Sequence, residues 1–398
     1  MGATTQVLPH WDMTTIFPGI DSPEFSVGFQ DAINSITELA ELWDALGIDV
    51  QEPVPLGDET VRHFERAIEK YNDVLRQTGT LRSYIVSFVS TNSRDDTAQA
   101  KLSQFEKNYT RVTQLGTRFT AWIGSLDIEE LLRRSEPARA HEFMLRKTKE
   151  HSMHLISPAE ESLAAELNLT SGAAWSRLHG NITSQLMVQV PLKAGAREMP
   201  MSLVRTLAYD PDRDTRRAAY EAELKGWAGV AVPIAAALNS IKGEVNTLVM
   251  RRNWGSALNA ALFNNNIDRE TLDAMMLAAR ESFPDFRRYF KAKARALGTE
   301  KLAWYDIFAP VGSGNKVWEY DEATAFVVKQ FGTYSDKMSR FAARAFDESW
   351  VDAEPRPGKR DGAYCMWIRG GESRVFANFK SSYAGMSTLA HELGHGYH

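Results

Sequence analysis

Apolar side chains recur every three or four residues through most of the chain, which is the spacing of one face of an α-helix. The first such stripe follows Ser22-Pro23, a pair typical of a helix start. The same period continues over 58–126, with predicted breaks at Thr78-Gly79 and around Ser93. Helices are also predicted over 229–252, 268–296 and 320–350. Long helices with short connections indicate an antiparallel bundle, so we expect a mostly α fold.

Two stretches of the chain alternate apolar and polar residues instead, as strands do. Residues 186–190 and 199–203 flank a predicted turn, and residues 363–368 and 374–379 flank the glycine-containing turn 369–373. Each pair predicts a β-hairpin. Because the first hairpin ends a long run of helices, we place a boundary there, with an N-terminal helical lobe at 1–184 and a second lobe at 185–398.

One aromatic segment stands between predicted helices, Trp304-Tyr305-Asp306-Ile307-Phe308, followed by Ala309-Pro310. It can be a packing element between the lobes, or it can line a groove between them. We expect it to do both.

Composition narrows the class of protein. The 398 residues are 43% hydrophobic and carry a formal net charge of −5, whereas nucleic acids and anionic membranes attract basic surfaces. We therefore expect no nucleic-acid partner and no membrane partner. A single cysteine, Cys365, and an N-terminus without a signal-peptide pattern predict a cytoplasmic protein.

The last predicted helix carries the pattern H-E-x-x-H in His391, Glu392 and His395. Residues four apart lie on the same helix face, so the two imidazoles can bind one metal ion, and Zn²⁺ is the ion we expect. Glu392 is then placed to accept a proton from a water on that ion. The alternative is a polar helix face with two solvated histidines. Gly394, in the helix interior, predicts the close approach of another backbone.

The pattern lacks the third protein ligand that a catalytic zinc site needs. His398 lies about 10 Å along the helix from His391, too far to share the ion. Glu372 is the nearest alternative inside the chain, and Cys365 alone cannot build a structural zinc site. We expect the third ligand to come from a further segment, in the same polypeptide or as a separate chain.

The strand just before this helix is the predicted substrate-binding element, through Arg374, Val375, Phe376, Ala377 and Asn378. An extended peptide can pair its backbone with the free edge of such a strand. If the strand lies inside a sheet instead, no free edge exists.

Several motifs, in this order, resemble the M3 family of zinc metallopeptidases: Trp11-Asp12, Trp304-Tyr305-Asp306-Ile307, Gly358-Lys359-Arg360 with Gly362-Ala363-Tyr364, and Thr388 through His398. The resemblance runs from about residue 8 to the last residue and covers about the N-terminal two-thirds of a family member.

The resemblance implies a two-lobed, mostly helical structure with a deep groove, and zinc-dependent cleavage of short oligopeptides. It implies His391 and His395 as zinc ligands and Glu392 as the general base. The family's third ligand, a glutamate on a later helix, and its tyrosine and histidine groups would all follow His398. A non-catalytic, helical peptide-binding or scaffold chain without a third ligand is the alternative function.

Overall fold

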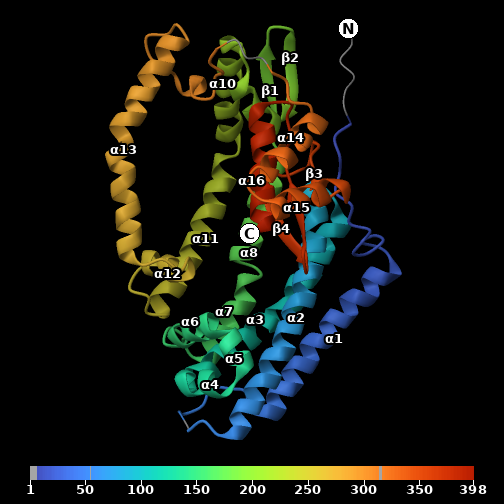
Figure 1. The fold of residues 1–398 in the computed structure, drawn as a ribbon, viewed down its shortest axis with the longest axis vertical. Coiled ribbons are helices and arrows are strands. Elements are labelled where there is room, and N and C mark those ends of the chain that lie inside the picture. Colours follow the sequence, from blue (N-terminus) through green and yellow to red (C-terminus); the bar gives the residue numbers. More distant parts are fainter. Residues whose placement is uncertain (1–6, 54, 313–315) are drawn as a thin grey trace.

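Helices make up most of the protein in its computed structural model, which describes residues 7–53, 55–312 and 316–398 (Figure 1). The predicted mostly α fold is confirmed. The first three helices are long and pack on one another: α1 (Pro23–Leu46), α2 (Asp58–Thr91) and α3 (Asp96–Ser125). Ser22 caps α1 by accepting a hydrogen bond from the backbone N–H of Phe25, as the Ser-Pro pair predicts.

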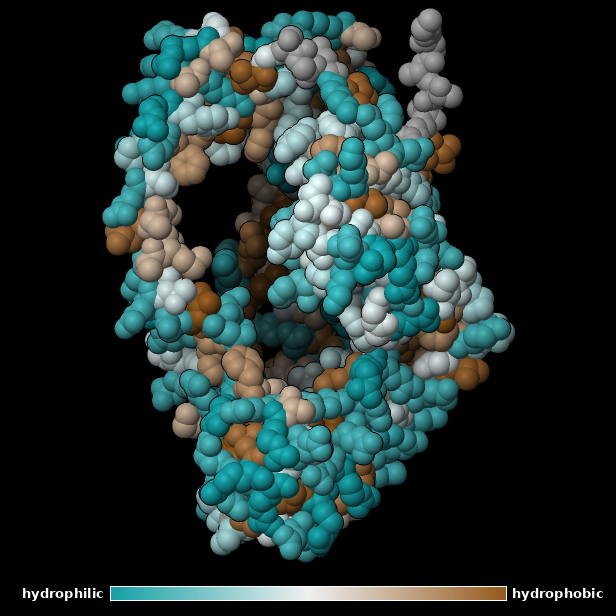
Figure 2. Space-filling model, viewed as in Figure 1, coloured by the Kyte–Doolittle hydropathy of each residue, from teal (hydrophilic) through white to brown (hydrophobic). Residues whose placement is uncertain are grey.

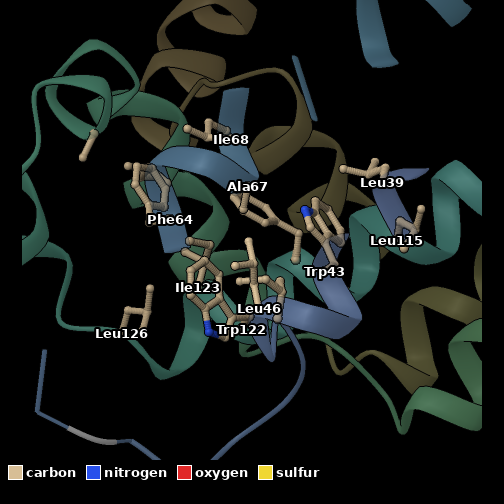
Figure 3. Close-up of a cluster of buried hydrophobic side chains, with 14 of the residues drawn as sticks. Leu39, Trp43, Leu46, Phe64, Ala67, Ile68, Leu115, Trp122, Ile123 and Leu126 are labelled. Carbon is tan, nitrogen blue, oxygen red and sulfur yellow. The ribbon is translucent and has the colours of Figure 1, made fainter. Parts of the chain in front are cut away.

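Apolar side chains of these helices form the largest core, part of which Figure 3 shows around Trp43, Phe64 and Trp122. The predicted break at Thr78-Gly79 is wrong, because α2 continues through it. The Thr78 hydroxyl donates to the carbonyl of Val74 one turn earlier, and Gly79 lies against the ring of Trp367. A single glycine costs a helix about 1 kcal/mol, which the burial of neighbouring turns outweighs.

Five shorter helices follow α3: α4 (Ile128–Arg134), α5 (Glu136–Ala140), α6 (Glu142–Ser152), α7 (Pro158–Asn168) and α8 (Gly172–Gln185). Then comes the first hairpin, β1 (Met187–Leu192) with β2 (Gly195–Pro200), which confirms a strand pair here. The second predicted strand, 199–203, is wrong in position. The chain is helical from Met201, immediately after Pro200 closes the ladder opposite Met187.

The middle of the chain is helical again and includes one helix that stands apart. Its elements are α9 (Met201–Thr206), η1 (Leu207–Tyr209), α10 (Arg213–Gly229), α11 (Ala231–Arg251), α12 (Ala257–Asn264) and α13 (Arg269–Ala296). Helix α13 buries only Lys293 and Ala294 of its described residues, and Figure 2 shows a deep opening between it and the body of the molecule.

The last part of the chain builds a small sheet and covers it with a helix. After η2 (Trp304–Asp306), α14 (Tyr320–Gly332) and α15 (Asp336–Asp347) come β3 (Val351–Asp352), β4 (Tyr364–Arg369), β5 (Glu372–Phe376) and α16 (Tyr383–Tyr397). The strand order is β3-β5-β4, with β5 parallel to β3 and antiparallel to β4. The predicted second hairpin, β4 with β5, is confirmed.

Among the described residues no single helix is long and apolar enough to cross a bilayer. Only the pair α10 and α11 reaches that length and composition together, and it bends by 65° at its joint.

Candidate functional site

Helix α16 carries the histidine pair and is fixed to the sheet before it by a tight connection. The hydroxyl of Ser382 caps the helix by accepting from the backbone N–H of Gly385 at 3.2 Å. The carbonyl oxygen of Lys380 lies so close to Gly385 that an added Cβ would collide with it, so only glycine fits. Met386, Leu389 and Leu393 are buried on the face of the helix that packs into the core. These contacts fix where the rest of α16 points.

His391 and His395 turn their rings toward one another on the exposed side of α16. Their Nε2 atoms lie 3.1 Å apart and their ring planes are nearly perpendicular, at 87°. Zn–N bonds are about 2.0–2.1 Å long, so two nitrogens at this separation can bind the same ion. The side chains therefore fit a divalent metal, as the four-residue spacing predicts.

Glu392 lies between the two histidines in sequence but is 6% exposed, against β4. Burial raises the pKa of its carboxyl group, while nearby His391 and His395 and a hydrogen bond from the backbone of Cys365 oppose that rise. The net direction is upward. A carboxylate with a raised pKa accepts a proton more readily, which is the property a general base needs.

No group of three or more His, Cys, Asp or Glu side chains suited to a metal ion occurs within 7–53, 55–312 and 316–398. Glu372, the alternative third ligand, is occupied elsewhere: its carboxylate bonds to Arg369 at 2.9 Å and lies 3.5 Å from Arg374. His398 is exposed at the end of α16. The described chain thus assembles two candidate ligands and one candidate base, and Glu372 does not join them.

Strand β5, the predicted substrate-binding element, lies between β3 and β4, so the free edge expected for pairing with a peptide is absent there. Arg374, Val375, Phe376 and Ala377 are each at most 1% exposed. Val375 and Ala377 donate their backbone N–H groups to the carbonyls of Trp350 and Asp352, both at 2.9 Å. Strand β3 provides this pairing, yet it is only two residues long and has no alternation that a sequence could show.

Arg374 serves the fold instead of a substrate. Its guanidinium donates to the carbonyl of Asp12 at 3.2 Å and to the hydroxyl of Thr15 at 3.1 Å, which ties the start of the chain to β5. Asn378 is the one predicted residue that reaches a pocket, but its side-chain amide donates to the carbonyls of Arg360 and Gly362 at 2.9 and 3.0 Å.

A pocket of about 540 Å³ lies beside the first half of α16. Trp304, Tyr305 and Phe308 form part of its wall, so this aromatic segment does line a pocket, but one whose lining residues all belong to the predicted second lobe. From α16 itself, Thr388 lines the pocket, three residues before His391 and therefore on nearly the same helix face. Thr388 thus places the pocket one helical turn from His391, although His391, Glu392 and His395 are not among its lining residues.

Lys380 is the pocket residue that sequence reasoning missed. Its ammonium lies 5.4 Å from the centre of the Tyr209 ring, and burial lowers its pKa to about 7, against a smaller opposing effect of Asp361. A single lysine in a linker gives no local signal, because its partners come from residues about 20 and 170 positions earlier.

The aromatic wall is anchored by a buried ion cluster. Asp306 is fully buried and accepts from Arg216 at 2.8 Å and from Arg213 at 2.9 Å. Burial alone would raise the pKa of Asp306, but the bonds to Arg213 and Arg216 outweigh it and hold the pKa below its ordinary value. This cluster joins η2 to α10 and so fixes the wall opposite α16.

Comparison with known proteins gives two family matches. A family model described as Peptidase family M3 matches residues 206–398, and one described as Oligopeptidase F matches residues 123–187. Group B oligopeptidase PepB of Streptococcus agalactiae is 21% identical over 400 residues, covering 98% of this chain and 63% of that protein. An oligoendopeptidase F homolog of Lactococcus lactis subsp. lactis is 22% identical, with the same two coverages.

A solved structure has the same fold. The crystal structure of oligoendopeptidase-F from Enterococcus faecium aligns with a TM-score of 0.64 and 19% identity, over 82% of this chain and 66% of that one. The chain spans about 63% of the length of the two curated relatives named above.

Proposed function

The chain belongs to peptidase family M3, and from this premise we propose that it forms the metal-binding part of a zinc-dependent endopeptidase that cleaves short oligopeptides. One observation supports the proposal most directly. His391 and His395 bring their Nε2 atoms to 3.1 Å, and the buried carboxyl group of Glu392 lies between them in sequence. The free thiol of Cys365 fits a reducing compartment, and we place the activity in the cytoplasm.

In this proposal each residue has a distinct role. His391 and His395 would hold the zinc ion, which when bound would lower the pKa of water and polarise a peptide carbonyl. Glu392 takes the proton of the attacking water and returns it to the departing amine. The backbone N–H of Cys365 holds the Glu392 carboxylate on the β4 side of the helix. The pocket beside Thr388 receives one side chain of the peptide.

The experiment uses the complete polypeptide, with the segment expected to supply the third ligand, and compares Glu392→Gln with the unchanged protein for zinc content and for cleavage of an internally quenched oligopeptide. Loss of the base should lower kcat by roughly 10² to 10⁴, while zinc stays bound because both histidines remain. Glu281→Gln, on the exposed surface of α13, is the matched control and should cleave normally. His391→Ala and His395→Ala should lose zinc. Equal cleavage by Glu392→Gln and the unchanged protein would refute the role of Glu392.

A non-catalytic peptide-binding role is the second candidate, and one observation favours it. Within the described ranges, no carboxylate joins the two imidazoles to complete a group of three ligands. Under this hypothesis the protein would contain no stoichiometric zinc and would bind oligopeptides without cutting them. The zinc content and the cleavage assay distinguish the two functions.

A further inference from the structure

We propose that the pocket beside α16 selects an acidic residue of the peptide, and that Lys380 is the group that recognises its carboxylate. The inference rests on the proposed peptidase function and adds a substrate class to it. Three features support it: the position of Lys380 relative to the histidines, the lack of a direct partner for its ammonium, and the burial of that ammonium beside an aromatic ring.

Lys380 lies close to the start of the helix that carries the two histidines. The carbonyl of Lys380 accepts from the backbone N–H of Ser382 at 2.6 Å and lies against Gly385, so the lysine backbone is fixed to the first turn of α16. Thr388, on the same helix, lines the same pocket one turn before His391. A peptide whose backbone passes the two histidines can therefore place a neighbouring side chain beside Lys380.

The cations that line the pocket differ in how directly they are paired. Arg205 pairs with Asp361 at 2.8 Å and with Glu223 at 3.4 Å. Arg216 is bound to the buried Asp306. Lys380 has no hydrogen-bond or ion-pair partner for its ammonium in the part of the chain that the structure describes. Of the five charged groups that line the pocket, Lys380 alone is thus available to an anion.

The surroundings of Lys380 strengthen its interaction with an anion. The Tyr209 ring lies beside the ammonium, Trp304 and Phe308 line the same pocket, and Lys380 is half-buried, so an ion pair there is screened less than in water. Burial lowers the pKa of Lys380 to about 7, so most of the protein carries the neutral amine there at pH 8. A bound carboxylate favours the ammonium form, and binding at pH 8 should therefore take up a proton.

The test uses peptide pairs that are identical except for Glu or Gln at one position, with each position around the cleaved bond varied in turn. At the position that enters the pocket, Glu should raise kcat/KM by roughly 10- to 100-fold over Gln, as expected for a charge-assisted hydrogen bond. Lys380→Met should reduce this ratio to about 1, and Lys380→Arg should retain it. Lys107→Met, an exposed lysine of α3, is the control for charge and should leave the ratio unchanged.

A binding measurement separates failure of this inference from failure of the proposed function. Calorimetry on the Glu392→Gln protein, in buffers of different ionisation enthalpy, should show tighter binding of the Glu peptide with proton uptake at pH 8. Lys380→Met in that background should abolish both.

Two results would distinguish the proposed selectivity of the pocket from the proposed peptidase function. If peptides are cut with no Glu preference in the unchanged protein, the selectivity of the pocket is refuted while the peptidase function stands. If nothing is cut but the Glu peptide binds through Lys380, the peptidase function is refuted and the assignment of the pocket stands.

Discussion

Asparagine in place of Asp306 would test how the aromatic wall of the pocket is held. Asp306 is fully buried, and Arg216, which it binds at 2.8 Å, is only 3% exposed. The substitution keeps the shape of the side chain but removes its charge, which leaves the Arg216 cation buried and uncompensated. Breaking a buried pair in this way costs about 3–5 kcal/mol.

The second arginine of the cluster provides the control. Arg213 binds the same carboxylate at 2.9 Å but is 47% exposed, so water screens it. Arg213→Met leaves the buried Asp306–Arg216 pair intact and should cost about 1 kcal/mol or less. Urea unfolding at pH 7, followed by tryptophan fluorescence, measures both variants.

The contribution of the Asp306 charge to the stability of the protein should change with pH in a defined direction. The pKa of Asp306 lies below its ordinary value in the folded protein, so its charge stabilises the fold above about pH 4, and that contribution is lost as the pH falls through the lowered pKa. The difference between Asp306→Asn and the unchanged protein should shrink in that acidic range. If Asp306→Asn unfolds within about 1 kcal/mol of the unchanged protein at pH 7, or no earlier than Arg213→Met, the ion cluster does not hold the wall.

Two further predictions concern the helix and the sheet of the site. Gly385→Ala should destabilise the protein by more than the roughly 1–3 kcal/mol of ordinary overpacking, because the added Cβ would collide with the backbone at Lys380. In contrast, Gly394→Ala should stabilise the helix by up to about 1 kcal/mol, because the added Cβ meets nothing within 4 Å among the described residues. Urea unfolding of both variants checks this, and equal effects would contradict it. Lys359 is buried, and its pKa is lowered to about 8. Above that pH the unfolded chain binds more protons than the folded protein, so stability rises with pH. Between pH 8 and 10.5 the free energy of unfolding of the unchanged protein should therefore rise by up to about 3 kcal/mol relative to that of Lys359→Met. Unfolding curves across this range measure it, and a difference that stays constant or falls would count against it.

The helices were predictable because each carries its own signal along a continuous stretch of chain. The aromatic stripe after Ser22 is such a signal, and α1 spans Pro23–Leu46 as the stripe indicates. The close approach of the two imidazoles was predictable for the same reason, since His391 and His395 need only one helical turn to meet. Both the helix and the approach of the two histidines depend only on residues close together in the sequence.

The predictions that differ from the structure concern features that depend on contacts between segments far apart in the sequence. Strand β5 became an inner strand because the two residues of β3 pair with it. Gly394 was expected to admit another backbone, but a Cβ there would meet nothing within 4 Å in the described ranges. The glycine that does admit one is Gly385, where the Lys380 carbonyl approaches, and no spacing rule marks it.

The tight connection between β5 and α16 has a consequence for how the site can move. The close approach of the Lys380 carbonyl to Gly385 holds the start of α16 against the segment that follows β5, so we expect no hinge at this point. Any motion that admits a peptide must then come from the facing wall, where Tyr209 and Trp304 are 41% and 73% exposed. In the proposed peptidase, a bound peptide would then be held from that side while α16 remains stationary.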